Sequence, residues 1–160
     1  MLNLYLPYTS KFDLETGTHC LTGKDAHGLA FGVGAGRTLE ESCSALRAWI
    51  LEILVSHADS GEDHFADLRR EPPRRGAFLT LDSMDLVPIR LRLQRAHKRF
   101  LQEDMASRMG TSRQNYAKLE RPGTNLTLKT ISQLERVLGV ELLALPTLAP
   151  RKAQARRVKS

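Results

Sequence analysis

Four side chains in the second half of the chain, Arg113, Gln114, Asn115 and Lys118, have types and spacing that suit contact with DNA bases. Arg and Lys donate hydrogen bonds to guanine, and Gln and Asn form paired hydrogen bonds with adenine. A helix over residues 113–120 would project these side chains outward from its first turns. The chemistry that they indicate is recognition of a DNA sequence.

The segment before these residues predicts how they are positioned. Apolar spacing favours a helix over 102–109, and Gly110 ends it as a C-cap. Ser112 supplies an N-cap oxygen for the next helix. Two helices joined by so short a turn are typical of a helix-turn-helix. The residues expected to hold these two helices together are Leu101, Met105, Met109, Tyr116 and Leu119. The alternative is an ordinary small helical bundle with a polar face over 88–138.

The first half of the chain predicts a small α+β domain. Alternating or short apolar runs indicate strands at 2–8, 18–22, 28–35 and 76–82. Between the third and fourth strands, Thr38 and Glu41 form a capping box for a helix that runs to about His57. The polar stretch 58–75 contains Pro72-Pro73 and is expected to be a loop. The order is therefore β-β-β-α-β.

The second half predicts helices throughout, and the whole chain divides into four parts. The helices are expected at 88–100, 102–109, 113–120 and 127–138, with Gly139 as a C-cap and 140–145 as a short strand or a fraying end. The predicted parts are an α+β domain at 1–70, a linker plus strand at 71–86, a helix-turn-helix domain at 87–146 and a disordered basic tail at 147–160.

The charges are split between the two halves. Residues 1–86 carry 8 Lys+Arg and 13 Asp+Glu, a net charge of −5. Residues 87–160 carry 16 Lys+Arg and 5 Asp+Glu, a net charge of +11. The basic half suits a polyanion, because each phosphate that is neutralised releases counterions. The acidic half is better suited to a basic protein.

Several function classes are disfavoured. Asp13, Glu15 and Asp25 lie in predicted loops, and Glu40 and Glu41 lie in a helix's first turn. They do not form the converging carboxylates of a two-metal nuclease, so no enzyme activity is expected. The five histidines follow no ligand spacing, and Cys20 and Cys43 form no CxxC pair, so no metal and no cofactor are expected. No apolar run approaches the roughly 20 residues of a membrane span. The N-terminus resembles no signal peptide, so a cytoplasmic protein is expected.

The sequence LQEDMASRMGTSRQNYAKLE resembles the core of the Cro/repressor class of helix-turn-helix proteins, the XRE type. The resemblance implies that Gln102 contacts a phosphate and that the four residues named first contact bases. It further implies that Asn125, Thr127 and Lys129 approach the DNA backbone. Met105 stands where the family more often has Leu.

The whole chain resembles HicB-like antitoxins that carry such a domain. Gly36-Arg37-Thr38-Leu39-Glu40-Glu41-Ser42 is similar to that family's Gly-Asp-Thr-Leu-Glu-Glu-Ala helix start. The run from Arg121 to Ile131, followed by Leu138-Gly139, is similar to the loop and helix of its DNA-binding half. The chain departs from the family at 27–34, where the usual Asp-Leu-Pro-Gly segment is missing.

This resemblance implies a reduced ribonuclease-H-like N-terminal domain that binds and blocks a basic, mRNA-cleaving toxin similar to HicA. It also implies a C-terminal domain that represses its own operon by binding operator DNA. Because one small domain buries little surface, a homodimer or higher even oligomer on a palindromic operator is expected. Two alternatives remain open: a transcription regulator whose N-terminal domain senses a ligand or only dimerises, and a DNA-guided nuclease.

Overall fold

The computed structural model describes residues 3–144, which begin with an antiparallel sheet. Its strands are β1 (Leu4–Asp13), β2 (Thr18–Lys24), β3 (Ala30–Gly36) and β4 (Ala77–Leu81). They lie in the order β3-β2-β1-β4, so β3 and β4 are the edges. All four predicted strands are confirmed, and β1 runs five residues further than expected because Tyr8–Asp13 pair with β2.

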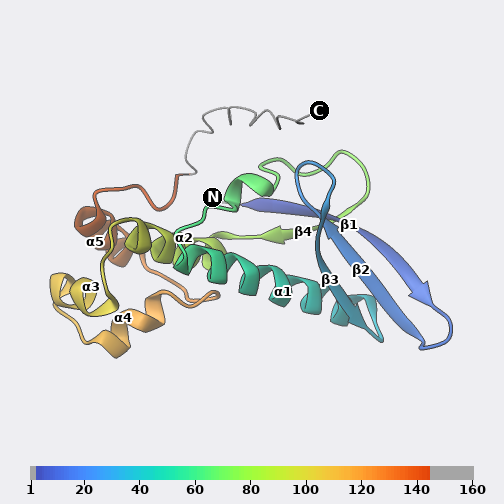
Figure 1. Cartoon of the computed structure of the whole chain (residues 1–160), viewed down its shortest axis with the longest axis horizontal. Helices are drawn as coiled ribbons and strands as arrows, with labels where there is room; N and C mark the ends of the chain where they lie inside the picture. The colour runs from blue at the N-terminus through green and yellow to red at the C-terminus, as the bar shows by residue number, and fades with distance from the viewer. Residues whose placement is uncertain (1–2, 145–160) are drawn as a thin grey trace, which may run out of the picture.

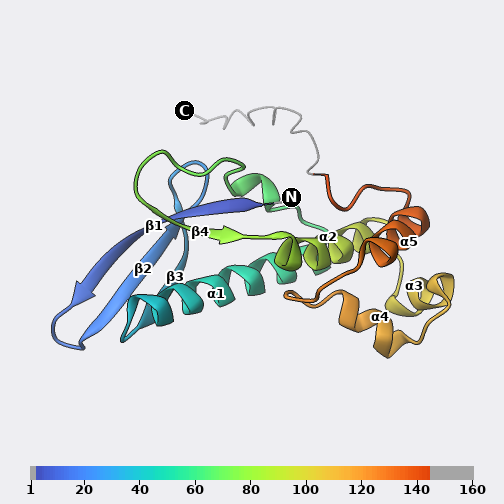
Figure 2. The same ribbon diagram turned by 180° about the vertical axis from the view of Figure 1, so that it is seen from behind.

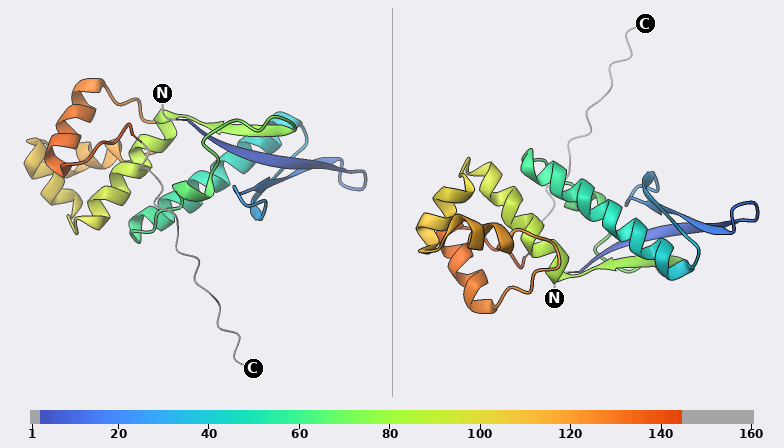
Figure 3. Two further views of the ribbon diagram at one scale, coloured as in Figure 1. Left: turned by 90° about the horizontal axis from the view of Figure 1, so that it is seen from above. Right: turned by 90° about the horizontal axis from the view of Figure 1, so that it is seen from below.

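One long helix, α1 (Leu39–Asp59), covers one face of the sheet (Figure 1). The hydroxyl of Thr38 accepts a hydrogen bond from the Glu41 amide at 3.1 Å, and a Glu41 carboxylate oxygen accepts one from the Arg37 amide at 2.8 Å. The Thr38 half of the predicted capping box is therefore confirmed, whereas Glu41 accepts from the residue before the N-cap and not from the N-cap amide. Figure 3 shows the sheet and α1 as two layers. The predicted β-β-β-α-β order is confirmed.

Sheet and helix approach closely where β3 crosses the first turns of α1. A Cβ atom added to Gly34 would lie 2.4 Å from both the Ser42 carbonyl oxygen and the Leu46 amide nitrogen. The Ser42 hydroxyl donates to the carbonyl of His19 on β2 at 2.9 Å. Glycine at position 34 is therefore what lets the backbone of α1 lie against the sheet.

The second half starts earlier than expected. Strand β4 leads directly into α2 (Ser83–His97), whose N-cap Asp82 accepts hydrogen bonds from the amides of Met84 and Asp85. The helix predicted at 88–100 thus begins at Ser83 and ends at His97. Pro88 lies inside it, and because proline has no N–H, the Met84 carbonyl has no helical donor. The Gly123 amide donates to that carbonyl instead, at 3.0 Å.

Three shorter helices complete the described chain (Figure 2). They are α3 (Gln102–Met109), α4 (Arg113–Leu119) and α5 (Leu128–Leu138), each within one residue of the predicted bounds. Gly139 ends α5 in the left-handed conformation, with φ of 67°, as predicted. Residues 140–144 contain no strand and form bends. The predicted tail at 147–160 lies outside the described residues.

The two halves share one hydrophobic core. Buried residues run without a break from Leu4 and Leu6 of the sheet, through Ile50 of α1 and Leu91 of α2, to Leu134 of α5. Ion pairs join α1 to α2 at both ends of their contact, between Arg47 and Asp85 and, at 2.7 Å, between Asp59 and Arg92. The division of the chain into domains stays a prediction. Within residues 3–144, no helix has the length and apolar character needed to cross a bilayer.

Candidate nucleic-acid interface

The turn between α3 and α4 has the geometry that the sequence predicted. Gly110 has φ of 65° and ψ of 35°, a left-handed conformation that favours glycine. Two residues later, the Ser112 hydroxyl accepts a hydrogen bond from the Asn115 amide at 3.2 Å and caps α4. The chain therefore reverses within three residues and leaves the start of α4 free to project outward.

Buried side chains hold α4 against its neighbours. Met105 of α3 and Tyr116 of α4 are fully buried, and Met109 and Leu119 pack against the same core. The expectation for Leu101 was wrong, since its side chain is 66% exposed. Leu101 is the extended N-cap residue of α3, so its side chain lies before the helix and contributes no packing between α3 and α4. Its amide donates to the Asp104 carboxylate at 2.7 Å.

The four predicted base-contacting side chains are all exposed on α4. They are Arg113, Gln114, Asn115 and Lys118. Nη1 of Arg113 lies 3.7 Å from Oε1 of Glu103, and both side chains are mainly in solvent. Such an exposed pair contributes little to stability, because water and salt screen it. The arrangement offers hydrogen-bond donors and acceptors of the kinds that read base edges in the major groove.

The residues predicted to approach the DNA backbone lie around the start of α5. Asn125, Thr127 and Lys129 are exposed. Thr127 also caps the helix, because its hydroxyl accepts a hydrogen bond from the Thr130 amide at 3.2 Å. The N-terminus of α5 therefore combines exposed polar side chains, a nearby lysine and the positive end of a helix dipole.

Gln102 differs from the other predicted site residues because its side chain is engaged inside the protein. Its Nε2 donates to Oε2 of Glu120 at 2.9 Å, and its side chain is half-buried at the start of α3. One N–H of the amide remains for another acceptor. Gln102 thus links α3 to the end of α4, and its predicted phosphate contact stays a prediction.

Glu120 is the centre of a buried polar network behind α4. Its side chain is fully buried and receives Nε and Nη2 of Arg95 at 2.5 and 3.1 Å. Burial alone would lower the pKa of Arg95, but the hydrogen bonds and charge of Glu120 outweigh it and raise that pKa. Burial, and then the negative charge of Glu120, raise the pKa of Tyr116 far above its usual value. The network fixes the angle at which α4 leaves the body of the protein.

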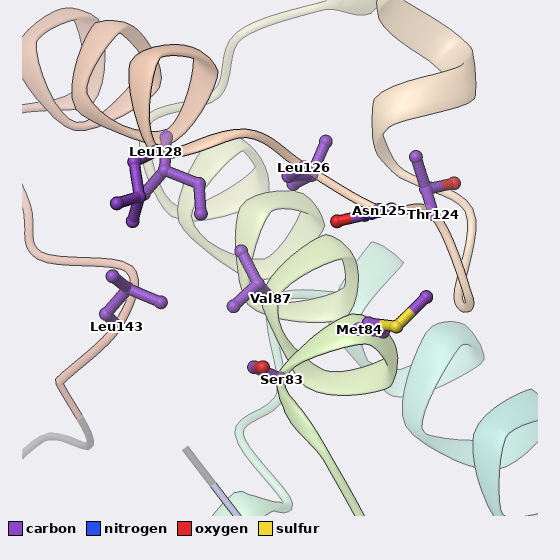
Figure 4. A pocket seen from close by; sticks show the side chains of 9 residues that line it. Ser83, Met84, Val87, Thr124, Asn125, Leu126, Leu128 and Leu143 are labelled. Atoms are coloured by element: carbon purple, nitrogen blue, oxygen red, sulfur yellow. The ribbon is translucent and has the colours of Figure 1, made fainter. Parts of the chain in front are cut away.

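A hollow of about 310 Å³ lies between the start of α2 and the segment that leads into α5 (Figure 4). Its wall is mainly apolar and includes Val87, Leu126 and Ile131, with Met84 and Leu128 exposed at 43% and 73%. Asn125 also lines it. The hollow is in the helical half of the chain, beside the predicted backbone-contacting residues, and Ser83 and Met84 on its wall follow the end of β4 closely.

Comparison with known proteins agrees with this geometry. Residues 91–145, about a third of the chain, match the family model described as helix-turn-helix. This segment is a helix-turn-helix domain. The match covers the C-terminal part of α2, from residue 91, and all of α3, α4 and α5, so it contains every predicted site residue.

One solved structure of a similar protein is described as a hypothetical transcription factor, NHTF, from Neisseria. It is 31% identical to this chain, and the alignment covers 41% of this chain and 78% of the Neisseria chain with a TM-score of 0.38. No curated protein matches the chain. The family match lies within the helical half of the chain.

One cluster of side chains in the sheet half was not predicted from the sequence. Among the five histidines, His57 and His64 come together with Glu62 at the end of α1. The spacing His-x4-Glu-x-His was visible in the sequence, but it signals a cluster only once the helix is known to end at Asp59 and the chain to fold back beside it.

Proposed function

We propose that this protein is a transcription regulator that binds operator DNA through α4 and represses the operon that encodes it. The main observation in support of this proposal is that the predicted base-contacting side chains are exposed on a capped helix within a helix-turn-helix domain. Phosphate contacts from the start of α5 would fix the register of α4 in the major groove. One such domain buries little surface, so a dimer on a palindromic site accompanies the proposal.

The sheet half supplies a second part of the proposal: it binds and neutralises a small basic toxin, as in HicB-like antitoxins. The order β-β-β-α-β followed by a helix-turn-helix is the order that this resemblance implies. The ribonuclease-H-like character of the sheet half and its lack of enzyme activity stay predictions.

The acidic charge of the sheet half is only partly available to a partner. Several carboxylates act within the fold: Asp25 accepts two backbone amides, Asp85 pairs with Arg47, and Asp82 caps α2. Glu40 and Glu52 of α1 are exposed instead. These two are among the carboxylates that remain to attract a basic protein.

The sheet offers a surface for such a partner on the face turned away from α1. On β3, Gly32 and Gly34 face α1, so Val33 points to the other side, where it is 59% exposed. Its neighbours in the register are Thr22 and Thr9, which continue an uncharged strip across the strands. As an edge strand, β3 also has unpaired backbone groups that a partner strand can use.

Co-expression tests this part. The neighbouring reading frame is expressed alone and together with this chain, and growth is measured. We expect toxicity that this chain relieves, and we expect Val33→Lys to abolish the relief because it places a positive charge before a basic partner. The matched control is Leu14→Lys, at a position that is 87% exposed away from β3. A neighbour that is harmless, or one that this chain neither binds nor neutralises, would refute the antitoxin role.

The alternative is a regulator whose affinity for DNA responds to a small ligand. The observation in its favour is the apolar hollow beside Asn125 and the start of α5. This hollow lies in the helical half of the chain, whereas the sequence predicted a ligand sensor in the N-terminal half. Filling it with Met84→Trp, at a lining residue that is 43% exposed, distinguishes the two. A ligand-responsive regulator should lose its response, whereas an antitoxin keeps toxin neutralisation when this hollow is closed.

A further inference from the structure

The end of α1 and the loop behind it bring three potential metal ligands to one point. His57 lies in the last turn of α1, and Glu62 and His64 follow in the loop. Oε2 of Glu62 lies 3.8 Å from Nε2 of His57 and 3.6 Å from Nε2 of His64. One ligand atom from each of the three residues falls within 4.8 Å of the others.

In each of the two imidazoles, Nδ1 already has a hydrogen-bond partner within the protein. Nδ1 of His57 lies 2.9 Å from the Ile53 carbonyl oxygen, and Nδ1 of His64 lies 2.6 Å from Oδ2 of Asp67. A carbonyl and a carboxylate only accept, so each Nδ1 carries a proton. In the neutral rings, the lone pair is then on Nε2, which faces Glu62. Metal-binding histidines are oriented by this kind of outer contact.

The groups that face one another here are all acceptors. They are two Nε2 lone pairs and a carboxylate, and the ring centroids of the two histidines are only 4.1 Å apart. A donor such as water or a metal ion can lie between them, and one divalent ion satisfies all three acceptors at once.

We propose that His57, Glu62 and His64 bind a divalent transition-metal ion, with Zn²⁺ the best match. Zinc takes two imidazole nitrogens and a carboxylate at about 2.0–2.2 Å, which places neighbouring ligand atoms about 3.3 Å apart in a tetrahedron. The two distances to Glu62 are within about half an ångström of that value, and the ligand atoms of the two histidines lie within 4.8 Å of each other, so side-chain rotations would complete the site. The three side chains are 38%, 62% and 27% exposed, which leaves the fourth position to water.

The bound ion would stabilise the loop after α1, which contributes side chains to the core. Phe65 and Leu68 follow the last ligand and are 5% and 3% exposed. The Gly61 carbonyl accepts from Nε2 of His97 at the end of α2, at 2.8 Å. Because the ion binds only where the loop is folded against α1, it stabilises the folded chain.

Titration of the untagged full chain with Zn²⁺, followed by calorimetry and thermal unfolding, tests the proposal. We expect one ion per chain and a rise in Tm. The double variant His57→Ala/His64→Ala should lose this binding. Because it keeps both cysteines, any zinc that it still binds measures binding to the thiols. Asp67→Asn should weaken affinity by about 10–100-fold, because it disturbs only the outer contact of His64.

The matched control is His27→Ala, an exposed histidine in the turn before β3 that should leave binding unchanged. Co²⁺ provides a second readout, since its visible spectrum distinguishes tetrahedral nitrogen and oxygen ligands from thiolates. Binding that the double variant retains, or that His27→Ala reduces equally, would overturn the proposal, as would no zinc-dependent change in Tm.

Discussion

Arg95 and Glu120 form a two-point ion pair behind the recognition helix, with Nε–Oε1 and Nη2–Oε2 distances of 2.5 and 3.1 Å. Arg95 lies on α2 and Glu120 is the C-cap of α4. Gln102 of α3 donates to the same carboxylate. One buried acid thus fixes the relative positions of three helices, which is what a DNA-reading surface requires.

The first prediction concerns this pair. Arg95→Met leaves the fully buried Glu120 carboxylate without its main partner and should lower the free energy of unfolding by about 3–5 kcal/mol. The double variant Arg95→Met/Glu120→Leu should recover much of that loss, because no unpaired charge remains. Urea unfolding measures both, with Arg113→Met as the exposed control. Equal destabilisation by the single and double variants would show that the charge is not the cause.

The second prediction concerns Tyr116. Its hydroxyl is buried and has no hydrogen-bond partner within the part of the chain that the structure describes. Tyr116→Phe removes this unsatisfied group at constant shape, so stability should be unchanged or rise by up to about 1 kcal/mol. The measurement is again urea unfolding. A loss of more than about 1 kcal/mol would mean that the hydroxyl donates a hydrogen bond, with Glu120 the nearest candidate.

A third prediction tests the close contact of sheet and helix. Gly34→Ala places a methyl group against the backbone of α1, which cannot move aside as a flexible side chain could. The free energy of unfolding should fall by at least about 2 kcal/mol. The control is Gly17→Asn, in a hairpin turn with open space around it and a φ of 65° that asparagine tolerates. Similar losses for both variants would contradict the packing explanation.

The fourth prediction uses the pair between Glu103 and Arg113. Glu103 carries a negative charge beside the DNA-reading surface and attracts the arginine that should reach DNA. Glu103→Gln should therefore tighten DNA binding several-fold at low salt, and the gain should shrink as salt rises. Fluorescence anisotropy over a salt series measures this, with Glu15→Gln in the β1–β2 turn as the control. A weakened interaction would show that Glu103 positions Arg113 productively.

The sequence predicted the elements of this fold well because their ends are marked by local chemistry. Thr38, Ser112 and Gly110 each satisfy or terminate a helix end with atoms of their own residue. The start of α2 was placed five residues late, because its Asp82 cap follows a strand without an intervening loop.

Features that depend on long-range folding were not visible in the sequence. Nothing local shows that Glu120 meets Arg95, 25 residues away, or that Gln102 donates to it. Leu101 fits the apolar spacing of a core residue, yet its position as an N-cap leaves it in solvent. The convergence of His57 and His64 likewise required the path of the loop after α1.

Binding of selected DNA is the most direct test of the central claim, that α4 reads a DNA sequence. A random DNA pool is enriched on the full chain, and affinities for the selected and a scrambled duplex are compared by anisotropy. The account predicts an enriched inverted repeat, a loss of about 1–3 kcal/mol on the selected site for Arg113→Ala, and for Lys129→Ala a smaller loss that is equal on both duplexes. The exposed Lys11→Ala on β1 should change neither. No enriched sequence, or an Arg113→Ala loss that is equal on both duplexes, would contradict it.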